Sequence, residues 1–497
     1  MISADIAKNE LGISIAEHII NGESEASGDQ ATLDVIAPRD RSVMGTAAQG
    51  GAREVDAAVK AARAAFPKWR DTAPRVRGRI LAKIADRLEE HAERIAKILS
   101  LENGNAIRTQ SRGELAFAVD TFRYFGGLAS EIKGEQIPLS IDKLDYSRRE
   151  PYGVVGAIIP WNAPVQLGTM KIAPAIASGN TLVLKTAEDA PFAILEIAKI
   201  CQEFLPAGVL NVVHGVGTIT GEALINNPDV DKLSFTGSTA VGSRILTAAA
   251  SRIIPVSLEL GGKNPQIVFP DADDDWAVDA AITGMRFFRQ GQSCTAGSRL
   301  FVHESIFDSF MSKFAAKVAA MKVGDPMDEA SDLGAIVNKK QFDRVCGFIN
   351  EGMNVDGGTV LTGGMPPTEG PLSKGYFATP TVFSHIDNEF NINRQEIFGP
   401  VVVAIPWKTE DEVIAMANNT HYGLSAFVHT KNIGAAIRTA HRIDAGWVQV
   451  NHGGGQVLGQ SYGGYKTSGM GREFSLEGML ESYTHRKHIS INLNVPN

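Results

Sequence analysis

The sequence is poor in cysteine, has no surplus of basic residues and contains no long apolar run. Its 497 residues include only three cysteines, Cys201, Cys294 and Cys346. Three widely separated cysteines form neither a disulfide framework nor a clustered metal-ligand set, so we expect a reducing compartment and no metal site. Acidic residues outnumber basic residues by 56 to 48, and the resulting net charge of −8 argues against nucleic acid as a partner.

The absence of a long apolar run argues against a membrane-spanning helix. No stretch of the chain approaches the roughly 20 apolar residues that a membrane-spanning helix needs. The first residues do not combine a basic region, an apolar core and a small-residue cleavage site, as a secretory signal does. We therefore expect a cytoplasmic protein without a membrane partner.

The composition is that of a globular protein, 44% hydrophobic and 21% charged, in a chain long enough for two or three domains. Residues 1–50 predict short strands and loops. Apolar residues at helical spacing then predict three helices, at 57–69, 75–101 and 115–132. Residues 133–152 are rich in turn residues and predict a hairpin excursion.

From residue 154 onward, short β-branched runs alternate with helical stretches. Such βα repeats indicate a parallel sheet covered by helices, with ligands bound at the carboxyl ends of the strands. The predicted strands lie near 154–159, 181–185, 209–213, 232–236 and 255–259. A second α/β lobe follows, with elements near 265–269, 274–289, 299–303, 305–321, 339–352, 401–405, 410–418, 425–428 and 447–450. We expect a small-molecule site in the cleft between the lobes.

Three polar side chains lie at turns or strand ends rather than inside apolar runs. Cys294 follows the small polar stretch Gly291-Gln292-Ser293, which suits either a nucleophile or a small-residue packing site. Glu259 ends a strand pattern and suits either a general base or a capping carboxylate. Asn162 lies between two prolines and is either an oxyanion donor or an ordinary turn residue.

Four motifs in register carry a resemblance to a known family. Residues 160–164 (PWNAP), 259–265 (ELGGKNP), 287–299 (FFRQGQSCTAGSR) and 396–400 (EIFGP) resemble the aldehyde dehydrogenase superfamily in order and in spacing. The resemblance runs from the helical region near residue 54 to the carboxyl end. It implies an α/β protein with two Rossmann-like lobes, one for the cofactor and one for catalysis, and a small β oligomerisation excursion.

The resemblance also implies domain boundaries and an assembly. The NAD-binding domain takes residues 1–132 and 153–262, the catalytic domain takes 263–477, and the bridging segments are 133–152 and 478–497. In the resembled family the excursion pairs with the carboxyl-terminal strand, here around Thr484 to Leu493, across a subunit boundary. We therefore expect a homodimer or a homotetramer.

The family mechanism assigns roles to five residues. The resemblance implies that the Cys294 thiolate adds to an aldehyde, giving a thiohemiacetal and then, after hydride loss, a thioester. Asn162 and the backbone N–H of Cys294 meet the oxyanion, and Glu259 takes a proton from the hydrolytic water. Lys171 and Glu473 match a Lys and a Glu that the family is thought to use in passing protons, although a plain ion pair explains them equally well.

The expected cofactor is NAD. The turn 236–242 has a G-x-x-x-x-G spacing and lacks both the G-x-G-x-x-G fingerprint and the Lys of a nucleoside-triphosphate loop. It is either a packing turn or, at a helix start, a pyrophosphate site. The family places a Lys and a Glu, here Lys185 and Glu188, on the adenosine ribose. The Glu188 carboxylate would repel the 2′-phosphate of NADP, so NAD is favoured, although NADP stays possible. The resemblance implies a cofactor set of Ile158, Pro160, Trp161, Lys185, Glu188, Gly217, Gly221, Thr236, Gly237, Ser238, Gly242, Leu260, Glu396 and Phe398.

The substrate pocket follows from matching positions in the family. None of the matched side chains is charged, which argues against a semialdehyde with a distal carboxylate. Aromatic walls, with Gln166 and Tyr462 as polar groups, favour an aromatic or oxygenated aldehyde. The matched positions are Phe117, Ala163, Gln166, Leu167, Met170, Phe288, Ser293, Thr295, Val457, Leu458 and Tyr462.

Three residues depart from the usual family pattern. Arg289 stands where Asn is usual, Gln395 where Glu is usual, and Tyr462 where Phe is more common. These departures bear on the substrate rather than on the reaction. The alternatives are a coenzyme A-acylating or semialdehyde dehydrogenase, a catalytically silent structural member, or a cysteine hydrolase, which needs a His beside its thiol.

Overall fold

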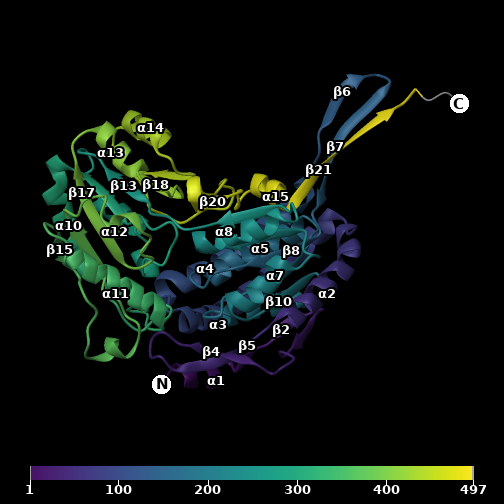
Figure 1. Cartoon of the computed structure of the whole chain (residues 1–497), viewed down its shortest axis with the longest axis horizontal. Coiled ribbons are helices and arrows are strands. Elements are labelled where there is room, and N and C mark those ends of the chain that lie inside the picture. The colour runs from purple at the N-terminus through teal and green to yellow at the C-terminus, as the bar shows by residue number, and fades with distance from the viewer. Residues whose placement is uncertain (1, 495–497) are drawn as a thin grey trace.

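The computed structural model describes residues 2–494 and shows two lobes, each built on its own sheet, with a thin β arm extending from the body (Figure 1). The first lobe has an eight-stranded sheet in the order β20-β12-β11-β8-β9-β10-β2-β3. Its five inner strands are parallel, as the βα repeats predicted. They are β12 (Val256–Glu259), β11 (Lys232–Thr236), β8 (Val154–Ile158), β9 (Thr181–Lys185) and β10 (Leu210–Val213).

The register brings the carboxyl ends of these strands to one edge of the sheet. Ile158 lies opposite Lys185, Val213 lies opposite the same lysine, and Thr236 lies opposite Glu259. Residues expected at the cofactor and at the base are therefore neighbours along this edge. The outer strands β2 (His18–Ile20), β3 (Glu23–Glu25) and β20 (Gly469–Met470) pair antiparallel.

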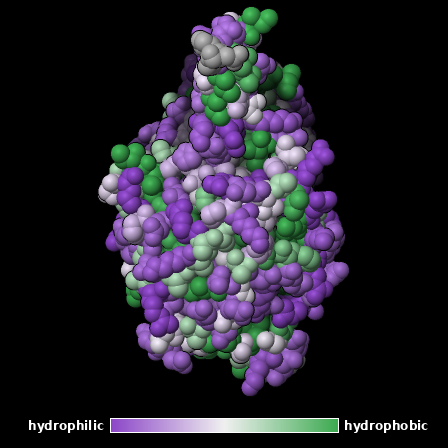
Figure 2. All heavy atoms as spheres, turned by 90° about the vertical axis from the view of Figure 1, so that its right-hand side faces the viewer, coloured by the Kyte–Doolittle hydropathy of each residue, from purple (hydrophilic) through white to green (hydrophobic). Residues whose placement is uncertain are grey.

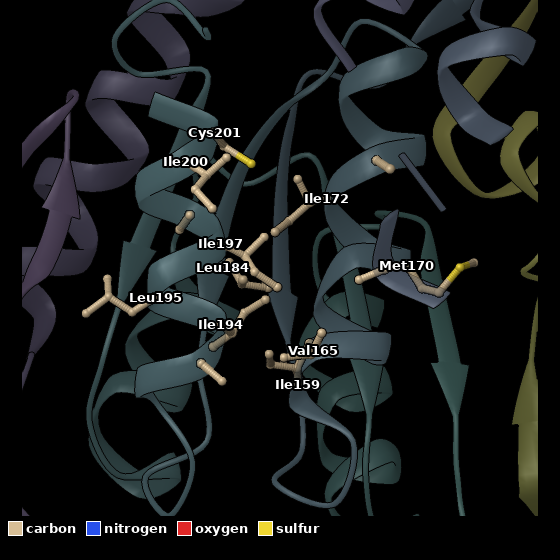
Figure 3. Packing of buried hydrophobic residues seen from close by; sticks show 14 of the residues in the cluster. Ile159, Val165, Met170, Ile172, Leu184, Ile194, Leu195, Ile197, Ile200 and Cys201 are labelled. Carbon is tan, nitrogen blue, oxygen red and sulfur yellow. The ribbon is translucent and has the colours of Figure 1, made fainter. Parts of the chain in front are cut away.

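Helices cover both faces of the first sheet because successive strand residues point to opposite sides. On one face Val155, Ala157 and Leu184 join a core with α3 (Pro74–Asn103), α4 (Arg112–Leu128), α5 (Pro164–Ala177) and α6 (Phe192–Gln202). Figure 3 shows side chains of α5 and α6 meeting those of β9 in this core. On the other face Val154 and Val183 meet α2 (Ala52–Arg70), α7 (Glu222–Asn226) and α8 (Thr239–Ala250).

The amino-terminal region contains one element that the sequence did not predict. The predicted helices at 57–69, 75–101 and 115–132 are present as α2, α3 and α4, the last ending three to four residues early in a 3₁₀ turn (Ala129–Glu131). Residues 1–50 were expected to hold only strands and loops, but a short helix α1 (Ser3–Asn9) opens the described chain. The expected strands follow as β1 (Ile15–Ala16), β2, β3, β4 (Thr32–Ile36) and β5 (Val43–Ala48).

The second lobe has a seven-stranded sheet in the order β15-β16-β17-β14-β13-β18-β19, parallel except for β15. Its strands are β15 (Thr359–Thr362), β16 (Thr381–Ser384), β17 (Val401–Trp407), β14 (Arg299–His303), β13 (Pro265–Val268), β18 (Ser425–His429) and β19 (Trp447–Val450). Its longer helices are α9 (Asp275–Gly284), α10 (Phe307–Ala319), α11 (Lys339–Met353), α13 (Glu410–Asn418) and α14 (Ile433–Arg442).

The helix predicted over 274–289 is wrong in its second half. It ends at Gly284 as α9, and a separate 3₁₀ turn covers Phe287–Arg289. Arg286 and Gln290 both have positive φ, 61° and 50°, which breaks the helix on either side of that turn. Gly291 continues the left-handed path where a Cβ would lie 2.0 Å from the carbonyl oxygen of Gly399. The break directs the following loop, which carries Cys294, toward the first lobe.

The arm is a three-stranded sheet of β21 (Thr484–Asn492), β7 (Lys143–Pro151) and β6 (Gln136–Ser140). The excursion and the carboxyl-terminal strand pair as expected, with Thr484 opposite Pro151 and Asn492 opposite Lys143. Both strands belong to the same chain, so the expectation that this pairing crosses a subunit boundary is wrong. The chain reaches the arm through β20, in the first sheet, and α15 (Leu476–Tyr483). No helix within residues 2–494 is long and apolar enough to cross a membrane.

Candidate active site

A cleft of about 700 Å³ lies between the lobes at the carboxyl edge of the first sheet. Residues from both lobes line it, and many belong to the predicted catalytic and cofactor sets. The predicted residues in its lining are Pro160, Trp161, Asn162, Leu167, Thr236, Gly237, Ser238, Glu259, Leu260, Cys294, Glu396 and Phe398.

The loop that carries Cys294 is held by Asn264, a residue that the sequence analysis did not single out. The Asn264 side-chain amide donates to the carbonyl oxygens of Cys294 and Ala296, at 2.8 and 2.9 Å, and its oxygen accepts from the Ser425 N–H at 2.9 Å. This amide connects the start of β13 to the cysteine loop and to β18. Its position just after the Gly261-Gly262 turn was the only signal in the sequence.

The Cys294 thiol is protonated at rest. Burial raises its pKa to about 12, with further contributions from the carboxylates of Glu396 and Glu259. The Tyr462 hydroxyl, 3.8 Å from Sγ, and the Arg289 guanidinium act in the opposite direction. Burial thus disfavours the thiolate, and groups that stabilise negative charge on Sγ are needed to form it.

Within the described chain, two N–H groups from residues that line the cleft, Asn162 and Cys294, remain free to donate. The Asn162 side-chain nitrogen donates to the Gln292 carbonyl oxygen at 2.9 Å, which fixes the amide and leaves its second N–H unused. The backbone N–H of Cys294 has no acceptor within residues 2–494. Both donors are suited to an oxyanion formed on a carbon bonded to Sγ.

Glu259 ends β12 inside a buried group of ionisable side chains that also contains Lys171, Glu473 and Lys232. Lys171 and Glu473 form an ion pair with side chains 0% and 3% exposed. Burial, followed by the neighbouring Glu473 carboxylate, raises the pKa of Glu259 well above its ordinary value, and Lys171 only partly opposes them. Glu259 Oε2 has no hydrogen-bond partner within the described chain. The ion-pair alternative for Lys171 and Glu473 is thus present, directly beside the candidate base.

The predicted cofactor residues of the first lobe follow its strand ends. Ser238 caps α8 through its side chain, which accepts from the Val241 N–H at 3.5 Å, so the start of α8 borders the cleft. Gly242, in the first turn of α8, packs under Leu260, and a Cβ there would lie 2.7 Å from that side chain. Lys185 Nζ contacts Glu188 at 3.1 Å, and Glu188 remains 44% exposed.

Six predicted cofactor residues do not line the cleft: Ile158, Lys185, Glu188, Gly217, Gly221 and Gly242. Gly217 and Gly221 begin and end a short π-helical turn (Gly217–Gly221). Gly221 faces Ile158, since a Cβ on this glycine would lie 3.8 Å from Ile158 Cδ1.

The second lobe contributes Glu396 and Phe398. Glu396 Oε1 accepts from the Gly262 N–H at 3.0 Å, which ties the lobes together beside Glu259. Burial raises the pKa of Glu396 to about 7, against the opposing effects of that hydrogen bond, Arg344 and Lys263. The Phe398 ring meets Trp161 edge to face at 5.3 Å. Residues that the sequence analysis missed also line this side, namely Asn338, Lys340, Gln341, Arg344 and Tyr422.

On the substrate side, several predicted pocket residues adjoin the core of the first lobe. Met170 and Tyr462 belong to that core, and Phe117, Leu458 and Cys294 pack against it. Aromatic rings are frequent here, with Phe474 5.7 Å from Phe117 and 5.1 Å from Tyr462.

The other predicted pocket residues differ in their placement. Ala163 and Thr295 are buried, Leu167 lines the cleft and Phe288 is half-buried. Ser293 Oγ lies 3.1 Å from Thr295 Oγ1. Val457 is 59% exposed and is not enclosed within the chain.

A charged residue that the predicted pocket set omitted lies beside it. Arg289 Nη2 is 3.4 Å from Gln166 Oε1 and 3.5 Å from Glu114 Oε2. Glu114 is buried, and its other oxygen accepts the Val165 and Gln166 N–H groups at the start of α5. The sequence shows that Arg289 is unusual for the family, but it does not reveal that Arg289 pairs with Glu114 in α4.

The sequence model of the aldehyde dehydrogenase family matches residues 25–489 of the chain. The chain belongs to this family. It is 43% identical to the aldehyde dehydrogenase of Alternaria alternata over 477 residues, 95% of each chain. The aldehyde dehydrogenase of Bacillus cereus, solved as an NAD+ complex, is 38% identical with a TM-score of 0.94, covering 97% of this chain and 98% of the other. The betaine aldehyde dehydrogenase of Staphylococcus aureus, also in complex with NAD+, is 35% identical with a TM-score of 0.95, covering 100% and 99%.

The family and the α/β fold inferred from the four motifs are confirmed. As an aldehyde dehydrogenase, the protein is an oxidoreductase. No group of three or more His, Cys, Asp or Glu side chains within residues 2–494 is arranged to hold a metal ion.

Proposed function

We propose that this aldehyde dehydrogenase oxidises its aldehyde to the carboxylic acid with NAD, through a covalent intermediate on Cys294. The observation that supports this most strongly is that Cys294, Asn162 and Glu259 line one cleft together with the Thr236–Ser238 turn. A nucleophile, an oxyanion donor and a base then border the same space as a dinucleotide site.

The residues of the cleft fit NAD. The start of α8 and the Ser238 hydroxyl suit the pyrophosphate, and the buried Thr236 hydroxyl has no partner within the described chain. Lys185 and Glu188 would hold the adenosine ribose, and Glu396 the nicotinamide ribose, beside Phe398. When bound, NAD supplies the acceptor for the hydride that leaves the substrate carbon. The relatives solved with NAD+ support this assignment.

Glu188 favours NAD over NADP. Its carboxylate is 44% exposed and is oriented by Lys185 at 3.1 Å. A 2′-phosphate on the adenosine ribose would bring a second negative group to this carboxylate, and like charges at short range repel. NADP is therefore accepted poorly.

In the first half of the reaction, the Cys294 thiol releases its proton to water, Sγ bonds to the aldehyde carbon and the C=O π electrons move onto oxygen. The second N–H of Asn162 and the backbone N–H of Cys294 receive that charge. Asn162 is held for this role by its 2.9 Å hydrogen bond to Gln292. Hydride loss then leaves the acyl group on sulfur as a thioester.

In the second half, Glu259 takes a proton from the water that attacks the thioester. The raised pKa of Glu259, caused mainly by burial, means that it accepts this proton readily once it is unprotonated. Lys171 and Glu473 border Glu259 and set how readily it loses the proton again. We infer that this ion pair passes the proton onward.

The substrate is an aromatic or oxygenated aldehyde. The aromatic contacts of Phe117, Phe474 and Tyr462 beside Cys294 support this. Arg289 does not require a carboxylated substrate, because Glu114, 3.5 Å away, offsets its charge.

The chain functions as a homodimer or homotetramer, in which residues 133–152 and 478–497 bridge subunits. Figure 2 shows apolar side chains on the arm, and Leu139, Ile141 and Leu144 are exposed there. Exposed apolar surface on a projecting sheet supports association with another copy. Three cysteines outside any disulfide support a reducing location such as the cytoplasm.

The test is NADH formation with aliphatic, carboxylated and aromatic aldehydes, each with NAD or NADP and with or without coenzyme A. We expect reduction of NAD without coenzyme A, fastest with aromatic aldehydes and much slower with NADP. A requirement for coenzyme A would indicate an acylating dehydrogenase, and a preference for carboxylated aldehydes would refute the substrate assignment. No reduction with any aldehyde would favour a silent member or a hydrolase.

A further inference from the structure

The hydroxyl of Tyr462 is the one side-chain polar group within residues 2–494 that is in hydrogen-bond contact with the Cys294 sulfur. Oη lies 3.8 Å from Sγ, within the range of a hydrogen bond that involves sulfur. The two residues are 168 positions apart, so the tertiary fold alone creates this contact. The contact involves the reacting atom itself.

The tyrosine ring is fixed in place. Tyr462 is 3% exposed, and its ring packs edge to face against Trp447 at 5.6 Å and Phe474 at 5.1 Å. Its backbone forms two hydrogen bonds with Glu473, at 3.2 Å from the Tyr462 N–H and 2.8 Å from the Glu473 N–H. A ring held by two aromatic neighbours and a backbone bridge keeps its hydroxyl beside Sγ.

The direction of the hydrogen bond follows from which of the two partners holds a proton. Burial raises the pKa of Tyr462 well above its ordinary value, so the hydroxyl keeps its proton at neutral pH. A thiolate has no proton, and the phenol is then the donor.

We propose that Tyr462 is a catalytic residue whose O–H donates a hydrogen bond to the Cys294 thiolate. The proposal rests on the role of Cys294 as nucleophile. The other ionisable groups that act on this sulfur are Glu396 and Glu259, which disfavour the thiolate, and Arg289 and Arg286, which favour it. Like Arg289, Tyr462 favours the thiolate of Cys294, but it does so through a direct hydrogen bond. No covalent bond to Tyr462 forms or breaks.

The test is the rate at which iodoacetamide alkylates Cys294 at several pH values, in the full-length protein without NAD or aldehyde. Peptide mass spectrometry separates Cys294 from Cys201 and Cys346. Tyr462→Phe keeps the ring and removes only the hydroxyl. Losing a hydrogen bond to an ionised group should raise the thiol pKa by about one unit and so lower the fraction of thiolate. The more basic thiolate is also more nucleophilic, which offsets part of the resulting loss in alkylation rate. We expect alkylation to slow by about 3- to 10-fold at each pH below the thiol pKa.

The matched control is Tyr465→Phe, in the same loop and 48% exposed, which should alkylate like the unmodified protein. A second variant should change the alkylation rate in the opposite direction. Replacing Tyr462 with 3-fluorotyrosine makes the hydroxyl a stronger hydrogen-bond donor and should speed alkylation of Cys294. Unchanged or faster alkylation in Tyr462→Phe, or slower alkylation with 3-fluorotyrosine, would overturn the proposal. Alkylation needs no turnover, so this result is independent of whether Cys294→Ala abolishes aldehyde oxidation, which tests the proposed function itself.

Discussion

Replacing Lys171 with Met removes the ion-pair partner of Glu473 from a buried group that contains two carboxyls and a second lysine, Lys232. The Lys171 and Glu473 side chains are 0% and 3% exposed and form an ion pair, with Glu259 beside them. Removing one partner of a buried pair typically costs about 3 to 5 kcal/mol. Each kcal/mol shifts the melting temperature of a domain of this size by about 2 to 4 °C, so Lys171→Met should melt about 6 to 20 °C lower.

Replacing Lys171 and replacing Glu473 should shift the pH dependence of thioester hydrolysis in opposite directions. Lys171 lowers the pKa of Glu259 and Glu473 raises it, while burial keeps it well above its ordinary value. Only unprotonated Glu259 accepts a proton from water, so hydrolysis should rise with pH through this pKa. Lys171→Met should move that rise to higher pH, and Glu473→Gln should move it to lower pH.

Both effects are measurable on purified variants. Scanning fluorimetry gives the melting temperatures, and the double variant Lys171→Met, Glu473→Gln should recover much of the loss, because Glu473 is then no longer a buried carboxylate without its ion-pair partner. Single-turnover release of the acid from acylated enzyme gives the pH profiles. A Lys171→Met melting temperature within about 2 °C of the unmodified protein, or pH shifts of the same sign in the two single variants, would refute the reasoning.

Three further predictions concern the cleft. Asn162→Ala should lower kcat by about 100- to 1000-fold while NAD binding, followed by tryptophan fluorescence, is retained, and a smaller loss would remove Asn162 as the oxyanion donor. Because burial raises the pKa of Glu396 to about 7, NAD affinity should increase as pH rises through about 7, where the carboxylate becomes the acceptor for ribose hydroxyls. Glu396→Gln should flatten this dependence in NAD titrations, and an unaltered slope would assign it to another group. Glu188→Gln should raise kcat/KM with NADP relative to NAD by about 10-fold in initial rates, unless another residue selects the cofactor.

Local patterns in the sequence were sufficient for most of the fold. The strands at 154–158, 181–185 and 232–236 are short β-branched runs bounded by turns, and their parallel arrangement follows from the helices between them. The overextended helix after residue 274 shows the limit of such patterns. Its end depends on left-handed conformations at Arg286 and Gln290, which contacts with other parts of the chain support and which helical spacing does not reveal.

Local motifs suggested the residues of the candidate site but not the contacts between them. Motifs identified Cys294, Glu259 and Asn162 because each lies in a recognisable local stretch. The neighbours that tune them come from far along the chain: Glu473 pairs with Lys171 across 302 positions, and Tyr462 reaches Cys294 across 168. Such pairings depend on how β20 and the segment after β19 return to the first lobe, which one sequence does not specify.

The central claim is that the acyl group is carried by Cys294 and released by Glu259. The most direct measurement is a single mixing of Glu259→Gln with NAD and an aromatic aldehyde, followed by NADH absorbance and by intact and peptide mass spectrometry. The account predicts about one NADH per site, little further turnover, and the acyl mass on the peptide that contains Cys294. Continued turnover near the unmodified rate, or NADH formed with no acyl mass on Cys294, would contradict it.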